Sequence, residues 1–179
     1  MANTYTLITS QVLTGTASSV TLSSIPGTYK DLILYVSART DNTSFMDLSV
    51  RFNGDSSATY STRRLWGANT GTTSADSTSG TSAGSGTAHL ASSFGNSNTA
   101  MVTGMFGAQY IYIPNYSSGS LTKTVGNRGG MADPNITSNS MWTGGYWAVT
   151  TAISSITCLP YQAGTNFLAD TSFYLFGIG

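Results

Sequence analysis

Apolar residues recur at every second position in several separate stretches of this chain, and that period of two restricts what it can fold into. In residues 30–39, KDLILYVSAR, alternate side chains from Leu32 onward share one side of an extended backbone. In residues 44–55, SFMDLSVRFNGD, alternate side chains from Met46 to Phe52 are apolar, and the run ends at an Asn-Gly turn. This alternation is typical of half-buried β-strands. No stretch combines a sustained helical period with caps, so an all-β fold is predicted.

Turn residues separate further segments of strand-like composition, with breaks at Pro26 and Pro114. The further strand candidates are TYTLITSQVL, SVTLSS, AQYIYIP, LTKTVG, YWAVTT, SSITCLPY and SFYLFGIG. With about eight to ten strands at this spacing, we expect an antiparallel β-sandwich, jelly-roll-like in character. A length of 179 residues favours one domain over residues 1–179.

The charge composition excludes several classes of function. Charged residues make up 8% of the chain and glutamate is absent, whereas ordinary globular domains contain about 25% charged residues. Seven basic residues balanced by seven acidic ones leave no electrostatic footprint for nucleic acid. No run approaches the ~20 apolar residues of a membrane span, and MANTYTLITS lacks the pattern of a signal peptide, so no membrane partner is expected. A chain with so little charge repulsion tends to associate with itself or with partners.

Residues 67–100, GANTGTTSADSTSGTSAGSGTAHLASSFGNSNTA, consist almost entirely of small polar residues. They hold too little apolar area for a core, so residues 67–104 are predicted to be a long low-complexity loop inserted in the sandwich. Long loops without secondary structure are uncommon and usually functional or disordered. Docking between subunits or β-pairing within the segment would order it. We favour docking, with this loop and one chain terminus as the docking elements.

Candidate catalytic groups are few. Residues 80–84, GTSAG, match the nucleophile-elbow pattern, but the match lies in a Ser/Gly tract, and His89 is the only histidine. A glycosidase needs two carboxylates, and the aspartates here mostly adjoin turns, where Asp usually bonds local backbone. One His and one Cys are too few ligands for a zinc site, and Cys158 is expected to be a small buried hydrophobe. We therefore expect no enzyme, no cofactor and no metal.

Aromatic residues gather in two places, in YIYIPNY and in MWTGGYWAV. Their rings could fill the core, which is the commonest role, form a subunit interface, or stack on a sugar. In YIYIP, alternation turns either both tyrosines or both isoleucines outward, which favours a strand with two covered faces. The predicted partner-contact residues are Thr72, Asp76, His89, Tyr110, Tyr112, Trp142, Tyr146 and Trp147.

Four segments carry a family resemblance: TYTLITSQVLTGTASSVTLSSIPGTYKDLILYVSAR, VRFNGDSSATYSTR, YIYIPNY and AISSITCLPYQAGTNFLADTSFYLFGIG. They resemble small virion structural proteins of tailed phages, especially cyanophages and other aquatic phages. The runs S-I-P-x-T-Y-x-D-L and F-x-L-F-G-I carry most of the resemblance, which covers roughly the first third and the last quarter of the chain. Residues 67–104 have no counterpart, and the resemblance transfers no catalytic signature.

Proteins of this kind are described as capsid decoration proteins, head fibres or tail fibres, and they are often three-fold. The resemblance implies a non-enzymatic virion structural protein, foremost a capsid decoration (cement) protein on the capsid surface that bridges and stabilises capsid subunits. Its expected partners are itself, as a homo-oligomer and by preference a homotrimer, and the major capsid protein or other virion proteins. The alternative is a tail-fibre or receptor-binding module that recognises a cell-surface glycan. The chain has no repetitive or coiled-coil shaft to project such a tip, which favours the first function.

Overall fold

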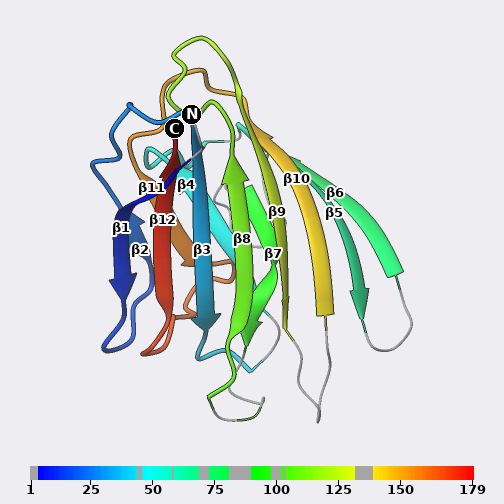
Figure 1. The fold of residues 1–179 in the computed structure, drawn as a ribbon. Helices are drawn as coiled ribbons and strands as arrows, with labels where there is room; N and C mark the ends of the chain where they lie inside the picture. Colours follow the sequence, from blue (N-terminus) through cyan, green and yellow to red (C-terminus); the bar gives the residue numbers. More distant parts are fainter. Residues whose placement is uncertain are drawn as a thin grey trace.

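The computed structural model describes residues 4–43, 46–57, 59–68, 73–80, 90–97, 102, 104–131 and 139–179. Within these residues there are twelve β-strands and no helix, which confirms the all-β prediction. The strands are β1 (Tyr5–Val12), β2 (Val20–Leu22), β3 (Asp31–Arg39), β4 (Met46–Phe52), β5 (Tyr60–Ala68), β6 (Thr73–Gly80), β7 (Leu90–Ser97), β8 (Gly107–Ile113), β9 (Lys123–Met131), β10 (Asn139–Trp147), β11 (Ile156–Pro160) and β12 (Ser172–Ile178). They form a β-sandwich of two antiparallel sheets (Figure 1).

The two sheets differ in size. The larger sheet has the strand order β1-β12-β3-β8-β9-β10-β5-β6, and the smaller sheet has the order β2-β11-β4-β7. The sheets are joined at one corner, where β7 also pairs in parallel with β3 through Ala38↔Asn96 and Arg39↔Ser97. The smaller sheet lies behind the larger one in Figure 1, with β7 against β9 and β10. We call the opposite side of the larger sheet, which no described strand covers, the outer face.

The core lies between the two sheets and is built from alternate side chains of their strands. Leu34 and Ile111 of the larger sheet and Val50 and Phe52 of the smaller sheet are completely buried there. Cys158 on β11 is also buried, as expected, and its burial raises the pKa of the thiol to about 12. The period of two in the sequence therefore marks the inward side of both sheets.

An aromatic group closes the core beside the Asn-Gly turn that follows β4. The indole of Trp147 is 2% exposed, stacks on Tyr60 at 6.2 Å between ring centroids, and lies 5.6 Å from the ring of Phe52. Its Nε1 donates a hydrogen bond of 2.6 Å to Asp55 Oδ2. The two turn residues before Asp55 have φ values of 52° and 69°, which confirms the predicted turn. Trp147 therefore holds the end of β10 against the end of β4.

The Asp55 carboxylate accepts three further hydrogen bonds beside the one from Trp147. They come from Ser57 N at 2.8 Å, Ser57 Oγ at 2.5 Å and Thr59 Oγ1 at 2.7 Å. Burial raises the pKa of Asp55, but the hydrogen bonds from Ser57, Thr59 and Trp147 together outweigh burial, so its pKa lies well below the ordinary value. The ionised form of Asp55 is therefore part of the folded state.

Acidification should destabilise the protein from about pH 5 downward, because the folded state relies on ionised Asp55. A carboxyl group whose pKa is depressed by folding stabilises the fold above its unfolded-state pKa and loses that contribution as the pH falls through its folded-state pKa. Asp55→Asn should cost about 1–3 kcal/mol at neutral pH and flatten this dependence. Chemical denaturation at a series of pH values checks the prediction, and an equally steep acid loss in the variant would contradict it.

The runs that carry the sequence resemblance meet at one end of the larger sheet. The ring of Tyr29, which precedes β3, lies over Gly177 near the end of β12. Tyr116, which follows β8, is completely buried, and its hydroxyl donates a hydrogen bond to the Pro26 carbonyl. These residues hold three segments together that are far apart in the sequence, so both runs have a structural role in the fold.

Gly177→Ala should destabilise the protein by about 1–3 kcal/mol, as expected for overpacking. A Cβ at this position would lie 2.3 Å from Cγ of Tyr29, an atom that rotation of the ring about its Cβ–Cγ bond does not displace. Gly15→Ala is the matched control, because a Cβ there would meet no atom within 4 Å, and it should change stability by less than about 0.5 kcal/mol. Thermal unfolding of both variants checks the difference, and equal melting temperatures would show that Tyr29 does not pack as described.

Residues 67–104 are not a single long loop, as their composition had predicted, because two strands fall within them. The strand β6 pairs with β5 along its whole length, and β7 pairs with β4 in the smaller sheet. β-Pairing with neighbouring strands of the same chain orders these two strands, and docking on another subunit stays a prediction. A β-ladder joins backbone groups, so an existing strand edge can order a Ser/Thr-rich segment that has few large apolar side chains. Together with β5, these strands bring the number of strands in the described part of the chain to twelve, above the predicted number of about eight to ten. The jelly-roll connectivity stays a prediction.

Candidate binding surface

Exposed apolar side chains gather on the outer face of the larger sheet. Ten large apolar side chains are exposed among the described residues, and eight of them belong to strands of this sheet. The eight are Tyr5, Leu7, Val12, Tyr35, Leu65, Trp142, Tyr146 and Tyr174. In β3, β10 and β12 they point to the outer face, because the side chains that alternate with them face the core. The pairing of β1 with β12 places its three residues on the same side as Tyr174. Exposed apolar surfaces of this kind usually mark an interaction site.

Six neighbouring strands each contribute one residue to a continuous row across the outer face. The strand registers place these residues directly opposite one another on neighbouring strands. They are Tyr174 of β12, Tyr35 of β3, Tyr110 of β8, Arg128 of β9, Trp142 of β10 and Leu65 of β5. We call this set the aromatic row. Neighbouring strands lie about 4.8 Å apart, so the row is about 24 Å long.

Members of the aromatic row also contact one another. The rings of Tyr35 and Tyr110 meet edge to face at 5.4 Å between centroids. The Arg128 guanidinium carbon lies 4.8 Å from the centroid of the Tyr110 ring, which is a cation–π contact. These contacts hold the side chains in place along the row while their outer surfaces stay open to solvent.

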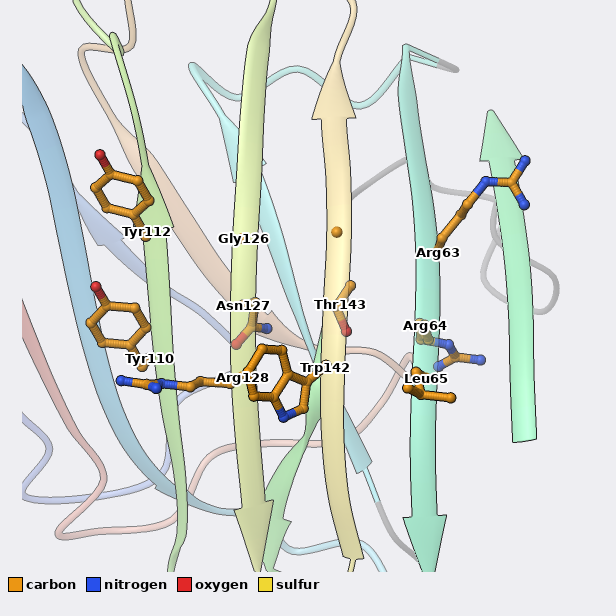
Figure 2. Close-up of a pocket in the computed structure, with 11 residues that line it drawn as sticks. Arg63, Arg64, Leu65, Tyr110, Tyr112, Gly126, Asn127, Arg128, Trp142 and Thr143 are labelled. Atoms are coloured by element: carbon orange, nitrogen blue, oxygen red, sulfur yellow. The ribbon is translucent and has the colours of Figure 1, made fainter. Parts of the chain in front are cut away.

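A groove of about 650 Å³ opens beside the aromatic row. Its floor is the backbone of β9 and β10, where Gly126 lies opposite Gly144. Side chains from four strands form its walls (Figure 2): Tyr110 and Tyr112 of β8, Arg128 of β9, Trp142 of β10, and Arg63 and Leu65 of β5. These walls are mostly apolar, which is typical of ligand sites.

Backbone geometry does not require glycine at either floor position. Neither Gly126 nor Gly144 has a positive φ, and an added Cβ would meet no atom within 4 Å at either position. A β-branched residue would suit a strand better than glycine does. Glycine inside a strand often marks a place where a ligand or another chain approaches the backbone. The two glycines keep the floor of the groove open.

Hydrogen bonds fix the ring of Tyr112 at the β8 side of the groove. Its hydroxyl donates to Asp31 Oδ2 at 2.7 Å, and Asp31 Oδ1 accepts from the Asn115 backbone N at 2.9 Å. The hydrogen bond to Asp31, with burial, raises the pKa of Tyr112 to about 12. The phenol therefore stays protonated, and both oxygens of the Asp31 carboxylate already have donors.

Two arginines give the groove a positive charge. Neither Arg63 nor Arg128 has a carboxylate partner in the described part of the chain. Arg64, by contrast, turns away from the outer face and pairs with Asp47 of β4 at 2.6 Å. The groove thus combines apolar walls with guanidinium groups on two of its strands.

The structure brings three of the predicted contact residues together, because Tyr110, Tyr112 and Trp142 all line the groove. Tyr146 lies on the same outer face, four residues along β10 from Trp142, and is 47% exposed. Trp147 faces the core, so it serves the fold and is not available to a partner.

The other predicted contact residues belong to residues 67–100. Asp76 lies in β6, but its side chain is outside the described residues. Thr72 and His89 are outside them altogether. The predicted contacts of these three residues with a partner stay predictions.

Sequence reasoning missed the two arginines and the two glycines of the groove. Arg63 and Arg128 are far apart in the sequence, and only the registers of β5, β9 and β10 bring them to one site. Gly126 and Gly144 look like strand ends in the sequence, whereas both lie inside strands. The sequence did contain a signal for the glycines. Gly126 lies two residues before Arg128, and Gly144 lies two residues after Trp142, so each glycine shares one side of its strand with an exposed large side chain.

Comparison with protein-family models, curated proteins and solved structures finds no match for this chain. Among the described residues, no helix has the length and hydropathy that crossing a membrane requires. Those residues also contain no group of three or more His, Cys, Asp or Glu side chains placed to hold a metal ion. The fold and the surface together define a β-sandwich with an exposed aromatic sheet face.

Proposed function

We propose that this protein is a non-enzymatic structural protein of a tailed-phage virion, and specifically a capsid decoration protein that bridges and stabilises capsid subunits. The concentration of exposed apolar side chains on the outer face carries the proposal, since eight of the ten such side chains lie there. The chain is also only 8% charged. A surface with so much apolar area and so little charge favours association with a partner.

One part of the outer face suits a protein partner. We define the assembly patch as the exposed side chains of the adjacent strands β1, β12 and β3, namely Tyr5, Leu7, Val12, Tyr35 and Tyr174. Among the described strands, β1 is an edge that pairs only with β12, so its free side can receive a strand from a neighbour.

The patch would act by burying surface in many copies. Apolar burial contributes about 25 cal/mol per Å², less the cost of ordering the interface, and a standard interface buries about 800 Å² on each partner. Each contact can be weak if the shell holds many of them. The proposed partners are further copies of this chain, by preference in a trimer, and the major capsid protein or other virion proteins. The preference for a trimer comes from the family resemblance.

The copy number per virion tests this proposal. Quantitative mass spectrometry of purified phage particles gives the amount of this chain relative to the major capsid protein. Hundreds of copies per particle would support a capsid decoration protein. A few dozen or fewer would contradict the capsid location and support a tail module, and absence from purified particles would contradict both.

The groove favours a second candidate function, a tail-fibre or receptor-binding module that recognises a cell-surface glycan. An exposed indole, an open floor and two arginines that have no carboxylate partner among the described residues form a concave, mostly apolar site with a few polar groups. The groove lies over β8, β9, β10 and β5, whereas the assembly patch lies over β1, β12 and β3. One molecule can therefore use the patch for assembly and the groove for a ligand.

A further inference from the structure

We propose that the groove beside Trp142 binds an acidic sugar unit of a polysaccharide, with the sugar ring against the indole and the anionic group on an arginine. This inference rests on the second candidate function and is independent of the capsid role. The chemistry that defines the ligand is a sugar ring that carries a carboxylate or a sulfate.

Trp142 supplies the surface on which a ring can stack. Its side chain is 66% exposed, more than any other large apolar side chain of the outer face. In the strand register it lies between Arg128 and Leu65. An indole offers a broad flat apolar face and one polar N–H, and the C–H side of a sugar ring is complementary to such a face.

The two floor glycines leave room for that ring. Gly144 follows Trp142 by two residues and Gly126 precedes Arg128 by two, so the glycines form a second row about 7 Å from the aromatic row. That spacing suits one ring that lies over the glycines and touches the indole. Any larger residue at either glycine would occupy this space, because a Cβ would project into the open groove.

The arginines supply the recognition of charge. The Arg128 guanidinium is held over the ring of Tyr110. The backbone of Arg63 lies two strands away, about 10 Å across the sheet, and its side chain extends from β5 toward β6 (Figure 2). A guanidinium group binds a carboxylate or a sulfate through parallel hydrogen bonds. The carboxylate of Asp31 accepts hydrogen bonds from Tyr112 and Asn115, and in the described part of the chain it forms no ion pair with either arginine.

An acidic sugar fits this set of groups better than other ligands do. A neutral sugar would cover the indole and leave both guanidinium groups without a counter-charge. A nucleic acid would need a broad basic surface, and this chain balances seven basic residues with seven acidic ones. A ligand with an apolar ring face and an anionic group can use both the indole and an arginine of the groove.

A glycan array with the full chain, followed by calorimetry, tests the inference. The array carries uronate-containing, sulfated and neutral oligosaccharides, and the strongest acidic probe is compared with a neutral oligosaccharide of equal length. We expect at least tenfold tighter binding of the acidic probe, with a preference that weakens as salt rises. Binding of uronates alone would assign a carboxylate ligand, and binding of sulfated probes alone would assign a sulfate ligand.

Groove variants place the binding on these residues. Trp142→Ala, Arg128→Gln and Gly144→Val should each weaken binding of the acidic probe at least tenfold. Tyr174→Ala is the matched control, because Tyr174 is an exposed ring of the same aromatic row outside the groove. The affinity of the Tyr174→Ala variant for the acidic probe should be within twofold of that of the unmodified protein. Melting temperatures of all four variants confirm that each is folded.

Three results would overturn the proposal, and they can be told apart. Wild-type affinity in Gly144→Val would show that the ligand does not use the groove. Equal binding of neutral and acidic probes, lost in Trp142→Ala, would remove the acidic specificity and leave the glycan function standing. No binding to any glycan of the array would remove both the inference and the second candidate function.

Discussion

Trp147→Ala should lower the free energy of unfolding by about 3–5 kcal/mol, the largest effect that we expect from a single substitution. The indole is 2% exposed and packs against the rings of Tyr60 and Phe52. Its loss would leave a cavity between the sheets. It would also remove the donor that reaches Asp55 Oδ2 at 2.6 Å, so a partly buried carboxylate would lose one of its hydrogen bonds.

Trp142→Ala is the matched control for this variant, since it removes the same side chain from the same strand. The indole of Trp142 is 66% exposed, so its loss should change stability by no more than about 0.5 kcal/mol. Guanidinium denaturation followed by circular dichroism measures both variants. Equal losses would contradict the assignment of Trp147 to the core and Trp142 to the outer face, and with it the geometry of the groove.

Tyr35→Asp should reduce the occupancy of the protein on its particle by about 100-fold or more, which corresponds to about 3 kcal/mol. Tyr35 belongs to the assembly patch and is 42% exposed in the isolated chain. In an assembled shell, an aspartate at this position would become a buried charge without a partner, which is strongly unfavourable. The isolated variant should stay folded, because in the absence of a partner the carboxylate remains in water.

Leu121→Asp is the control for the Tyr35 variant. Leu121 is 52% exposed, more than Tyr35, and lies between β8 and β9 outside the strands of the outer face. The occupancy of the Leu121→Asp variant on the particle should stay within twofold of that of the unmodified protein. Both variants are added to particles that lack the protein, and bound protein is quantified after sedimentation. Equal loss in both variants, or none in Tyr35→Asp, would contradict the role of the assembly patch.

The strands that the sequence predicted correctly are those in which burial on one side forces the pattern. Residues 30–39 and 44–55 alternate because one face of each strand contacts the core, and they correspond to β3 and β4. In YIYIP the isoleucines are the buried face, and the tyrosines point outward and are only partly covered. The strands β6 and β7 were missed because they consist mostly of small polar residues, and the two large apolar residues of β7, Leu90 and Phe94, do not alternate with a period of two. These two strands form because they pair with the edges of neighbouring strands, and no local stretch of sequence reveals those edges.

The site was predictable only in its aromatic part. Tyr110, Tyr112 and Trp142 stand out by residue type, but their position around one groove depends on the pairing of β8, β9 and β10. The glycines misled the sequence reasoning, because glycine usually weakens or ends a strand. The candidate strand LTKTVG ends at Gly126 and YWAVTT begins after Gly144, so one floor glycine lay at the end of a predicted strand and the other lay outside any.

Oxidative footprinting of the protein on purified particles tests the central claim most directly. Mass spectrometry compares the oxidation of each tyrosine and tryptophan in the particle-bound and in the isolated protein. We expect strong protection of Tyr5, Tyr35 and Tyr174 on the particle, while Trp142 in the groove stays as reactive as in isolation. Equal reactivity of the three tyrosines in both states would contradict the claim that the assembly patch packs against its neighbours in the virion.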